Sequence, residues 1–466
     1  MAWKVFPEYP ANLDALKAIN ALLTGLAGAL AFLLFTRRTD RTPRLVAFAA
    51  VVMLGYGSWQ MMALGTALLS EPLFLVLATT TLLMSGRTDD RTPEVRLAAA
   101  IGLLAAATFL TRGIGLTLVA AVLLGEFLRE WPLGWKFSKP RLVLAITALA
   151  PVFAWMAWTH SRAGDIPQVL LGPYGSYGDW YLSDAMVTPG RVAKIASAHW
   201  TPFLANLQYM WLPDAAASAA IVVLTAVAGL FVVGSLRVAR RNPALAAFPP
   251  LYLLVVMAWP YEPDRFMYAI LPLVTLIAAE GAVVAAERIR QDLSGWGPLL
   301  LFAGLGLLLL NAAAYQTRAQ ARLAWARVQI VPAVVYAPLN AWIRANVPED
   351  AIIASGLDPY VFWQTGRTAV PAWQFRPSDY WRYDGSPTTL ARDLDELIAA
   401  TGISWVVVVR DEAKSGLTIQ AFVDRYPDRI RVAFEQVTGP YTGVIYEVLP
   451  QGEVFAEPPA TPPSPQ

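Results

Sequence analysis

The sequence has no cysteine and only two histidines among its 466 residues. The lack of cysteine excludes disulfides, iron–sulfur clusters and thiolate zinc sites, and two distant histidines exclude an HExxH peptidase. Charged residues are scarce at 15%, and the net charge of +2 is too small to indicate a nucleic-acid binder. Hydrophobic residues, by contrast, make up 56% of the chain, and the mean hydropathy is +0.46. This composition excludes a disordered chain and predicts a membrane protein.

Ten apolar runs follow one another along the first 315 residues. A helix needs about 20 residues to cross the hydrocarbon core, with a range near 17–25. Two of the shorter runs are separated by Arg112, and we count them as two spans because an unpaired arginine is costly at bilayer depth. The pattern predicts an α-helical polytopic membrane protein with about ten transmembrane helices, at Leu13–Thr36, Leu45–Met62, Thr66–Met84, Leu97–Leu110, Ile114–Leu128, Leu142–Trp158, Ala215–Leu236, Ala244–Trp259, Phe266–Ala286 and Trp296–Tyr315.

The loops between these runs differ strongly in their content of lysine and arginine. The loops on one side carry 16 basic residues in 49 positions, and those on the other side carry 5 in 73. Because basic loops remain in the cytoplasm, the long loop 159–214 and everything after Tyr315 are predicted to be extracytoplasmic. Met1 would then also lie outside without a signal peptide, so we expect a further span upstream of this sequence.

After the transmembrane domain (1–315), short helix and strand patterns alternate over residues 316–450. This alternation predicts a small α/β domain with a partly parallel sheet. The domain has no GxGxxG and no GxxxxGK[ST], so nothing supports nucleotide binding. Residues 451–466 are rich in proline and are expected to form a disordered tail. Strands are expected at Ala351–Ser355, Ser404–Arg410, Ile430–Glu435 and Gly443–Leu449, and helices at Ala337–Asn346, Tyr360–Thr365, Leu390–Thr401 and Leu417–Tyr426.

Polar residues at the outer ends of the predicted spans are the candidates for chemistry. Glu71 precedes a proline, so it should lie at a helix N-terminus near the outer interface. A carboxylate there is costly to bury unless it binds a proton, a cation or an arginine, and the alternative is a snorkelling or capping glutamate. Arg112, beside Gly113 and Gly115, offers a planar fork suited to phosphate oxygens, or else it is an anchor to lipid headgroups.

A further cluster precedes the ninth predicted span. Glu262, Asp264 and Arg265 lie together there, with Tyr268 one helical turn farther on. They could bind substrate, or they could form a local ion pair that simply ends the span.

The long outer loop carries aromatic residues among glycines. Tyr174, Tyr177 and Trp180 offer faces that suit stacking on a sugar ring, although aromatic residues are also common at any membrane interface. His160 and His199 flank this segment; either could act as a base, but a loop histidine is more often simply solvated.

The order of these features resembles the bacterial polytopic glycosyltransferases of the C-type superfamily, which includes protein mannosyltransferases and lipid A aminoarabinose transferases. The resemblance spans most of the chain, although each motif is short. The matching pieces are SEPLF at Ser70–Phe74, LTRG at Leu110–Gly113, Arg265 with Tyr268 ahead of Leu-Pro, and an outer domain that begins AWIRANVPED at Ala341–Asp350 and continues to YVFWQTGR at Tyr360–Arg367.

The resemblance implies transfer of a sugar from a polyprenyl-phosphate donor to a glycan, lipid or protein acceptor, with inversion, on the outer face of the bacterial inner membrane. Glu71 matches the family's second acidic position, and Arg112, Arg265 and Tyr268 fall where the lipid phosphate would be held. The family's catalytic aspartate lies in a first outer loop that this sequence lacks, so either the start is placed too late or the chain is an inactive relative. No metal site is assigned, and a divalent cation is left open.

Two other classes of function remain open. A transporter or flippase for lipid-linked saccharides predicts charged residues in the middle of the spans, where this chain is almost uncharged apart from Glu280. A non-catalytic membrane protein of envelope assembly would use the outer domain to bind its partners.

Overall fold

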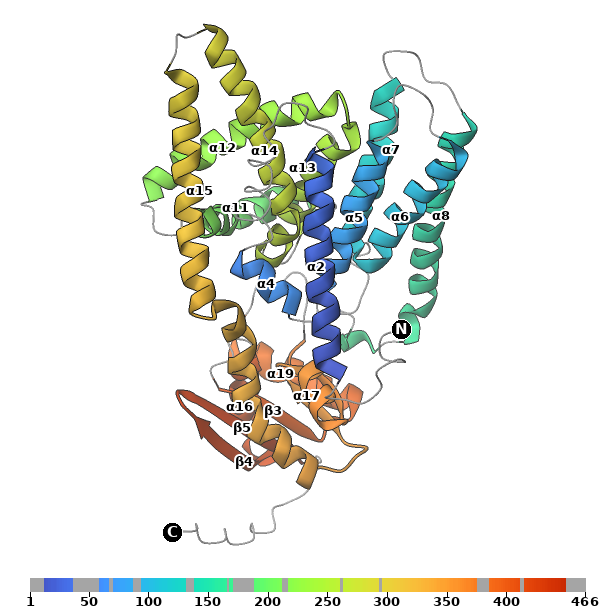
Figure 1. Ribbon diagram of the computed structural model, residues 1–466. Coiled ribbons are helices and arrows are strands. Elements are labelled where there is room, and N and C mark those ends of the chain that lie inside the picture. Colours follow the sequence, from blue (N-terminus) through green and yellow to red (C-terminus); the bar gives the residue numbers. More distant parts are fainter. Residues whose placement is uncertain are drawn as a thin grey trace. The chain divides into compact units, whose positions relative to one another are not determined.

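The computed structural model describes residues 12–36, 58–66, 70–86, 94–130, 138–165, 167–170, 188–211, 217–259, 263–292, 296–374, 385–410 and 415–449 (Figure 1). The chain divides into two compact units. The helical unit falls within Met1–Ser161 and Gly178–Val328, and the α/β unit falls within Arg162–Tyr177 and Gln329–Gln466.

The described part of the helical unit consists of helices, as expected where apolar side chains leave the peptide groups to satisfy one another. They cover nine of the ten predicted spans, and most of Leu45–Met62 lies outside the described residues. The helices are α2 (Asn12–Thr36), α4 (Trp59–Thr66), α5 (Glu71–Ser85), α6 (Val95–Thr111), the 3-10 turn η2 (Gly113–Gly115), α7 (Leu116–Glu130), α8 (Lys139–Arg162), α11 (Arg191–Trp211), α12 (Ala217–Ala239), α13 (Pro243–Ala258), α14 (Asp264–Asp292) and α15 (Gly297–Ala321).

Four helices among the described residues are long and apolar enough to cross a membrane. These spans are Asp14–Leu34, Lys139–Arg162, Ala220–Ala239 and Arg265–Ile289, and a fifth is obtained if α4 and α5 count as one bent span. Helices α6 and α13 are apolar but shorter. The structure therefore confirms a mostly helical chain with several candidate membrane spans, and the count of ten spans stays a prediction.

Helices α5 and α13 contribute many side chains to the main apolar core of the helical unit. Phe74, Leu75 and Leu82 of α5 are buried there together with Phe248 and Tyr252 of α13. Apolar packing of this kind fills the space between helices with dispersion contacts, which is the main source of cohesion inside a bilayer.

Asn242 joins the C-terminal part of α5 to the N-terminus of α13. Its side-chain oxygen accepts a hydrogen bond from the backbone N–H of Leu245 and caps α13, and its amide nitrogen donates to the carbonyl of Leu82, at 3.1 and 3.0 Å. Both free polar groups of the buried side chain are thus satisfied.

Helices α12 and α14 cross at very close range. A Cβ on Gly281 would overlap the carbonyl oxygen of Leu230, so only glycine allows this approach. Beyond the crossing, Arg237 pairs with Glu280 at 3.5 Å and with Glu287 at 3.2 Å. Glu280, the one acidic residue noted inside a span, is therefore paired.

The α/β unit contains a five-stranded sheet in the order β2-β1-β3-β5-β4. Strands β1, β2 and β3 are parallel, and β5 is antiparallel to both β3 and β4. This agrees with the predicted partly parallel sheet. The elements are α16 (Ala324–Asn346), β1 (Ile352–Ser355), α17 (Asp358–Thr365), β2 (Thr368–Pro371), α19 (Pro387–Thr401), β3 (Trp405–Val409), α20 (Ser415–Arg425), η7 (Pro427–Arg429), β4 (Ile430–Thr438) and β5 (Tyr441–Val448).

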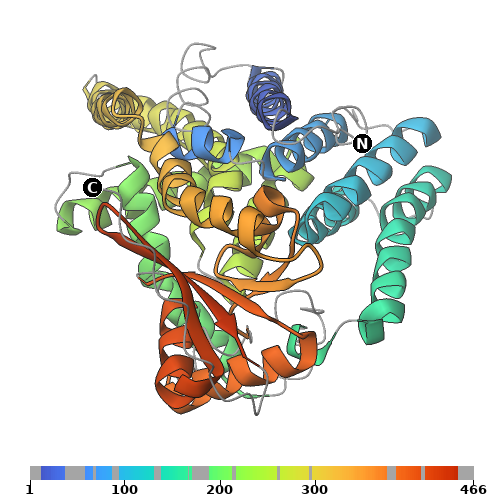
Figure 2. The ribbon, with the colours of Figure 1, turned by 90° about the horizontal axis from the view of Figure 1, so that it is seen from below.

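The two faces of this sheet carry separate apolar cores. Val406 and Val408 of β3 belong to the core formed with α19 and α20, while Val407 and Val409 belong to the core formed with α16 and α17. The unbroken valine run of β3 is thereby explained, because a strand buried on both faces needs apolar residues at every position. Figure 2 shows helices on both sides of the sheet.

Two elements differ from the expectation. The segment 159–214 is not simply a loop, because α8 continues to Arg162 and α11 lies within it. Residues 163–165 and 168–170 form the short turns η4 and η5, and Val169 and Leu170 of η5 pack into the core beside α19. Strand β2 was not predicted, since it has only four residues and ends at Pro371.

Candidate functional site

Glu71 begins helix α5, as the proline after it predicts. Its side chain is 1% exposed. Nη1 of Arg112 and Nε of Arg265 both pair with its Oε1 atom, and the second distance is 2.8 Å. Its other oxygen, Oε2, has no hydrogen-bond partner among the described residues. A buried carboxylate is thus neutralised by two guanidinium groups rather than exposed or snorkelling.

Arg112 lies in the turn that joins α6 to α7. It has an extended backbone with φ −152°, and the carbonyl of Arg112 accepts a hydrogen bond of 2.8 Å from the N–H of Gly115. A Cβ on Gly115 would come within 2.6 Å of the backbone of Thr108 and Phe109, so the turn requires glycine at this position. The tight turn holds the guanidinium toward Glu71.

Arg265 comes from the first turn of α14 and is the more accessible of the two arginines. Its side chain is 52% exposed, whereas that of Arg112 is 9% exposed. The guanidinium of Arg112 also lies over the ring of Phe266, 5.4 Å from its centroid, which is a cation–π contact. The two arginines therefore differ: one is held on several sides, and the other reaches toward the surface of the helical unit.

The three charged residues come from the beginnings or ends of three separate helices. One carboxylate and two guanidiniums leave an excess of one positive charge. Such a group favours an anion, and the planar fork of an exposed arginine suits a pair of phosphate oxygens. The sequence-based expectation for Glu71, Arg112 and Arg265 named these residues separately, and the structure brings them together.

The other candidate residues are not among the charged residues that pair with Glu71, and several of them lie outside the described residues. Tyr268 is half-buried on α14 and packs against apolar residues of two clusters. Asp264 is the first residue of α14. Glu262, Tyr174, Tyr177 and Trp180 lie outside the described residues, so their expected roles in binding substrate stay predictions.

Sequence reasoning missed Tyr252, which lies next to this site. Its hydroxyl donates a hydrogen bond of 3.0 Å to the carbonyl of Phe266. The same hydroxyl interacts electrostatically with the charged groups of Glu71, Arg112 and Arg265. The only signal was one tyrosine inside an apolar run, which is equally typical of a core residue.

Within the described ranges, no group of three or more histidine, aspartate or glutamate side chains is placed to hold a metal ion. His199 is buried on α11, on the same face as Ile195 and Arg191, and is therefore not the solvated loop residue expected. His160 is exposed near the end of α8.

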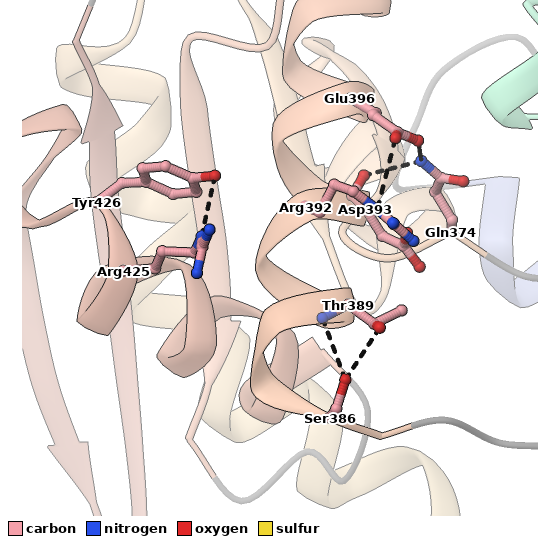
Figure 3. A network of polar contacts seen from close by, with 8 residues as sticks. All are labelled: Gln374, Ser386, Thr389, Arg392, Asp393, Glu396, Arg425 and Tyr426. Atoms are coloured by element: carbon pink, nitrogen blue, oxygen red, sulfur yellow. Dashed lines mark hydrogen bonds and ion pairs between the residues drawn. The ribbon is translucent and has the colours of Figure 1, made fainter.

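The polar contacts of the α/β unit have a different character (Figure 3). Ser386 caps α19 by accepting a hydrogen bond from the N–H of Thr389, and the amide of Gln374 donates to Glu396 and to the carbonyl of Asp393. Glu396 is half exposed. These contacts fix the position of α19 and are typical of structural capping and surface pairing.

A scan against protein-family models gives no match, and a search of the curated proteins gives none either. Solved structures with a similar arrangement include ArnT from Cupriavidus metallidurans in the apo state, with a TM-score of 0.48 and 13% identity over 96% of this chain and 85% of that one. The same ArnT bound to undecaprenyl phosphate gives a TM-score of 0.44 at 12% identity, over 95% of this chain and 85% of that one.

The Archaeoglobus fulgidus oligosaccharyltransferase, in complex with zinc and sulfate, is a third such structure. It gives a TM-score of 0.44 and 14% identity over 95% of this chain. This chain spans 63% of the length of that protein.

Proposed function

We propose that the chain is a membrane glycosyltransferase that moves a sugar from a polyprenyl-phosphate donor to a glycan, lipid or protein acceptor. The observation that carries the proposal is the buried contact of Glu71 with Arg112 and Arg265. Burying such a group costs several kcal/mol of desolvation per ion. Apolar residues of similar size in its place would make the protein equally stable or more stable. A cluster kept at that cost is a functional-site candidate.

A polyprenyl-phosphate sugar fits both properties of this site. Its long apolar chain belongs in the bilayer beside apolar helices such as α5 and α14, and its phosphate needs positive charge at the end of those helices. Arg265 is exposed enough to reach a phosphate oxygen, while Arg112 is fixed behind it by Glu71 and Phe266.

The reaction class follows from this placement. The acceptor oxygen attacks the anomeric carbon, the bond from that carbon to the phosphate oxygen breaks, and the phosphate leaves with the electron pair. The guanidiniums stabilise the charge that grows on the leaving phosphate. A direct displacement of this kind inverts the anomeric carbon. A carboxylate has to accept the proton of the acceptor hydroxyl. Glu71 is already paired with two arginines, so we assign it to holding them and do not assign the base to it.

The extracytoplasmic position of the α/β unit in a bacterial inner membrane is part of the proposal. The distribution of basic residues in the loops supports it. The chain connection is a second argument. Turn η5 (Gln168–Leu170) follows closely after the end of α8 at Arg162, and it packs beside α19 in the core of the α/β unit. The α/β unit and the C-terminal end of α8 therefore belong on the same side of the membrane.

The test is sugar transfer by the full chain, reconstituted in vesicles with a panel of polyprenyl-phosphate-linked hexoses and pentoses. We expect Arg265→Ala and Arg112→Ala to lower transfer by about a hundredfold or more, because each removes positive charge that stabilises the leaving phosphate. Arg410→Ala is the matched control, since Arg410 is 49% exposed in the other unit and should not affect transfer.

Each other outcome has a definite meaning. Transfer at the wild-type rate by the two arginine variants would contradict the site. Movement of the donor across the vesicle membrane without any transfer product would replace the proposal with a flippase. Neither transfer nor movement by the full chain would favour a non-catalytic protein of envelope assembly.

A further inference from the structure

Tyr252 is a fully buried residue of α13 whose contacts converge on the charged cluster. Its hydroxyl donates to the carbonyl oxygen of Phe266, in the first turn of α14. Arg265 precedes Phe266 directly. A side-chain hydrogen bond to this carbonyl therefore fixes the backbone that carries the exposed arginine.

The ring of Tyr252 contacts a second helix of the site. Its centroid lies 6.2 Å from that of Phe74, which comes one helical turn after Glu71 on α5. The ring of Phe248, on the same helix as Tyr252, lies 5.8 Å away in an edge-to-face arrangement. Aromatic pairs of this geometry are favourable beyond their apolar burial. Tyr252 thus packs against the start of α5 and is hydrogen-bonded to the start of α14.

Phe266 also links Tyr252 to the remaining charged residue. The face of the Phe266 ring lies under the guanidinium of Arg112. One hydrogen bond from Tyr252 therefore acts on the residue that neighbours Arg265 in the chain and contacts Arg112 in space. The first turn of α14 therefore carries Arg265 and supplies the ring that contacts Arg112.

Helix α13 can transmit such a constraint because it is fixed at both ends. Asn242 caps its beginning and bonds to the carbonyl of Leu82 on α5, and Tyr252 lies near its other end. Buried side chains of α13 between these points belong to the main core of the helical unit. The helix is a rigid support for the site rather than part of its surface.

We infer that Tyr252 is a positioning residue of the donor site, which sets the distance between the guanidiniums of Arg112 and Arg265 through its hydrogen bond to Phe266. The inference rests on the proposed function, since it takes the phosphate of a polyprenyl lipid as the ligand. The hydroxyl does not touch the ligand; it holds the turn that presents Arg265.

The experiment measures binding of undecaprenyl phosphate to the purified full chain in detergent, beside its thermal unfolding without lipid. We expect Tyr252→Phe to weaken binding by about tenfold, because the turn that presents Arg265 is no longer held in place. Its unfolding midpoint should stay close to that of the wild type, because the ring contacts with Phe74 and Phe248 remain. Tyr426→Phe, which removes a hydroxyl that accepts from Arg425 at 3.3 Å in the other unit, is the matched control.

Two further substitutions at position 252 separate positioning from simple stability. 4-Aminophenylalanine retains an N–H donor and should restore binding, while 4-methylphenylalanine fills the same space without a donor and should not. The comparison of these two variants also tests the positioning role if the phenylalanine variant fails to fold. Equal binding by the wild type and the methyl variant would overturn the inference. Wild-type binding by Arg265→Ala would instead overturn the proposed donor site itself.

Discussion

The two units of this chain use carboxylate–arginine pairs in opposite settings. In the helical unit Glu71 is 1% exposed and pairs with two arginines, whereas in the α/β unit Glu435 and Arg410 are 41% and 49% exposed at 3.3 Å. An exposed pair contributes about 0–1 kcal/mol, and a buried one is strongly destabilising only when a partner is removed. Position rather than the presence of a pair therefore distinguishes a functional candidate from a surface contact.

The polar contacts at the start of α19 differ from those of Glu71. On α19 the capping serine and the pairs with Gln374 and Glu396 bind other groups of the same domain (Figure 3). In the helical unit one oxygen of Glu71 has no hydrogen-bond partner among the described residues. A polar atom left without a partner at a buried site is costly.

The largest expected effect comes from removing the buried carboxylate. Glu71→Gln keeps the size of the side chain but removes the buried carboxylate charge with which both guanidiniums pair, so we expect a loss of about 3–5 kcal/mol in the free energy of unfolding. Glu435→Gln breaks the exposed pair in the same way and should cost less than about 1 kcal/mol. Unfolding of both variants in mixed micelles with rising SDS measures the difference, and equal losses would remove the basis of the comparison.

The fold was largely predictable because its signals are local. The apolar runs predict the helices, the proline after Glu71 predicts the start of α5, and the valine run of β3 predicts a buried strand. Helix α11 was missed because its buried positions, Arg191, Ile195 and His199, mix charged and apolar residues on one face.

The site was predictable only in part, because its contacts are not local. The sequence indicates that Glu71, Arg112 and Arg265 each belong near a helix end, but their meeting depends on how three helices pack. Tyr252 has no polar neighbour along the chain, and its hydrogen bond to Phe266 exists only once α13 lies beside α14. Pairings of this kind cannot be predicted from spacing alone.

A middle-sized effect is expected from the turn that holds Arg112. Gly115→Ala places a Cβ about 2.6 Å from the backbone of Thr108 and Phe109, so the turn has to shift. We expect a loss of about 1–3 kcal/mol in stability and weaker binding of undecaprenyl phosphate, since Arg112 moves with the turn. Gly113→Ala is the matched control, because a Cβ there meets nothing within 4 Å. If both alanine variants behave alike, close backbone packing does not position the arginine.

The smallest expected effect concerns Tyr446 of the α/β unit, an ionisable side chain that is buried in its neutral form. Burial raises the pKa of the Tyr446 hydroxyl above its ordinary value of 10.0, and Arg410 opposes this in part. As the pH rises past that value, the unfolded chain loses this proton before the folded one does, so stability is complete below it and declines above it.

Tyr446→Phe removes this source of alkaline instability. The difference in stability between wild type and variant should be constant below the ordinary tyrosine pKa and should shift in favour of the variant above it. Phenolate absorbance of the folded full chain provides the direct check, because the titration lost on substitution should have its midpoint above 10.0. A midpoint below the ordinary value would show that the charge of Arg410 outweighs burial, and one at the ordinary value would show that this hydroxyl is solvated. The α/β unit would then bury no ionisable group at Tyr446, and the contrast with Glu71 would become stronger still.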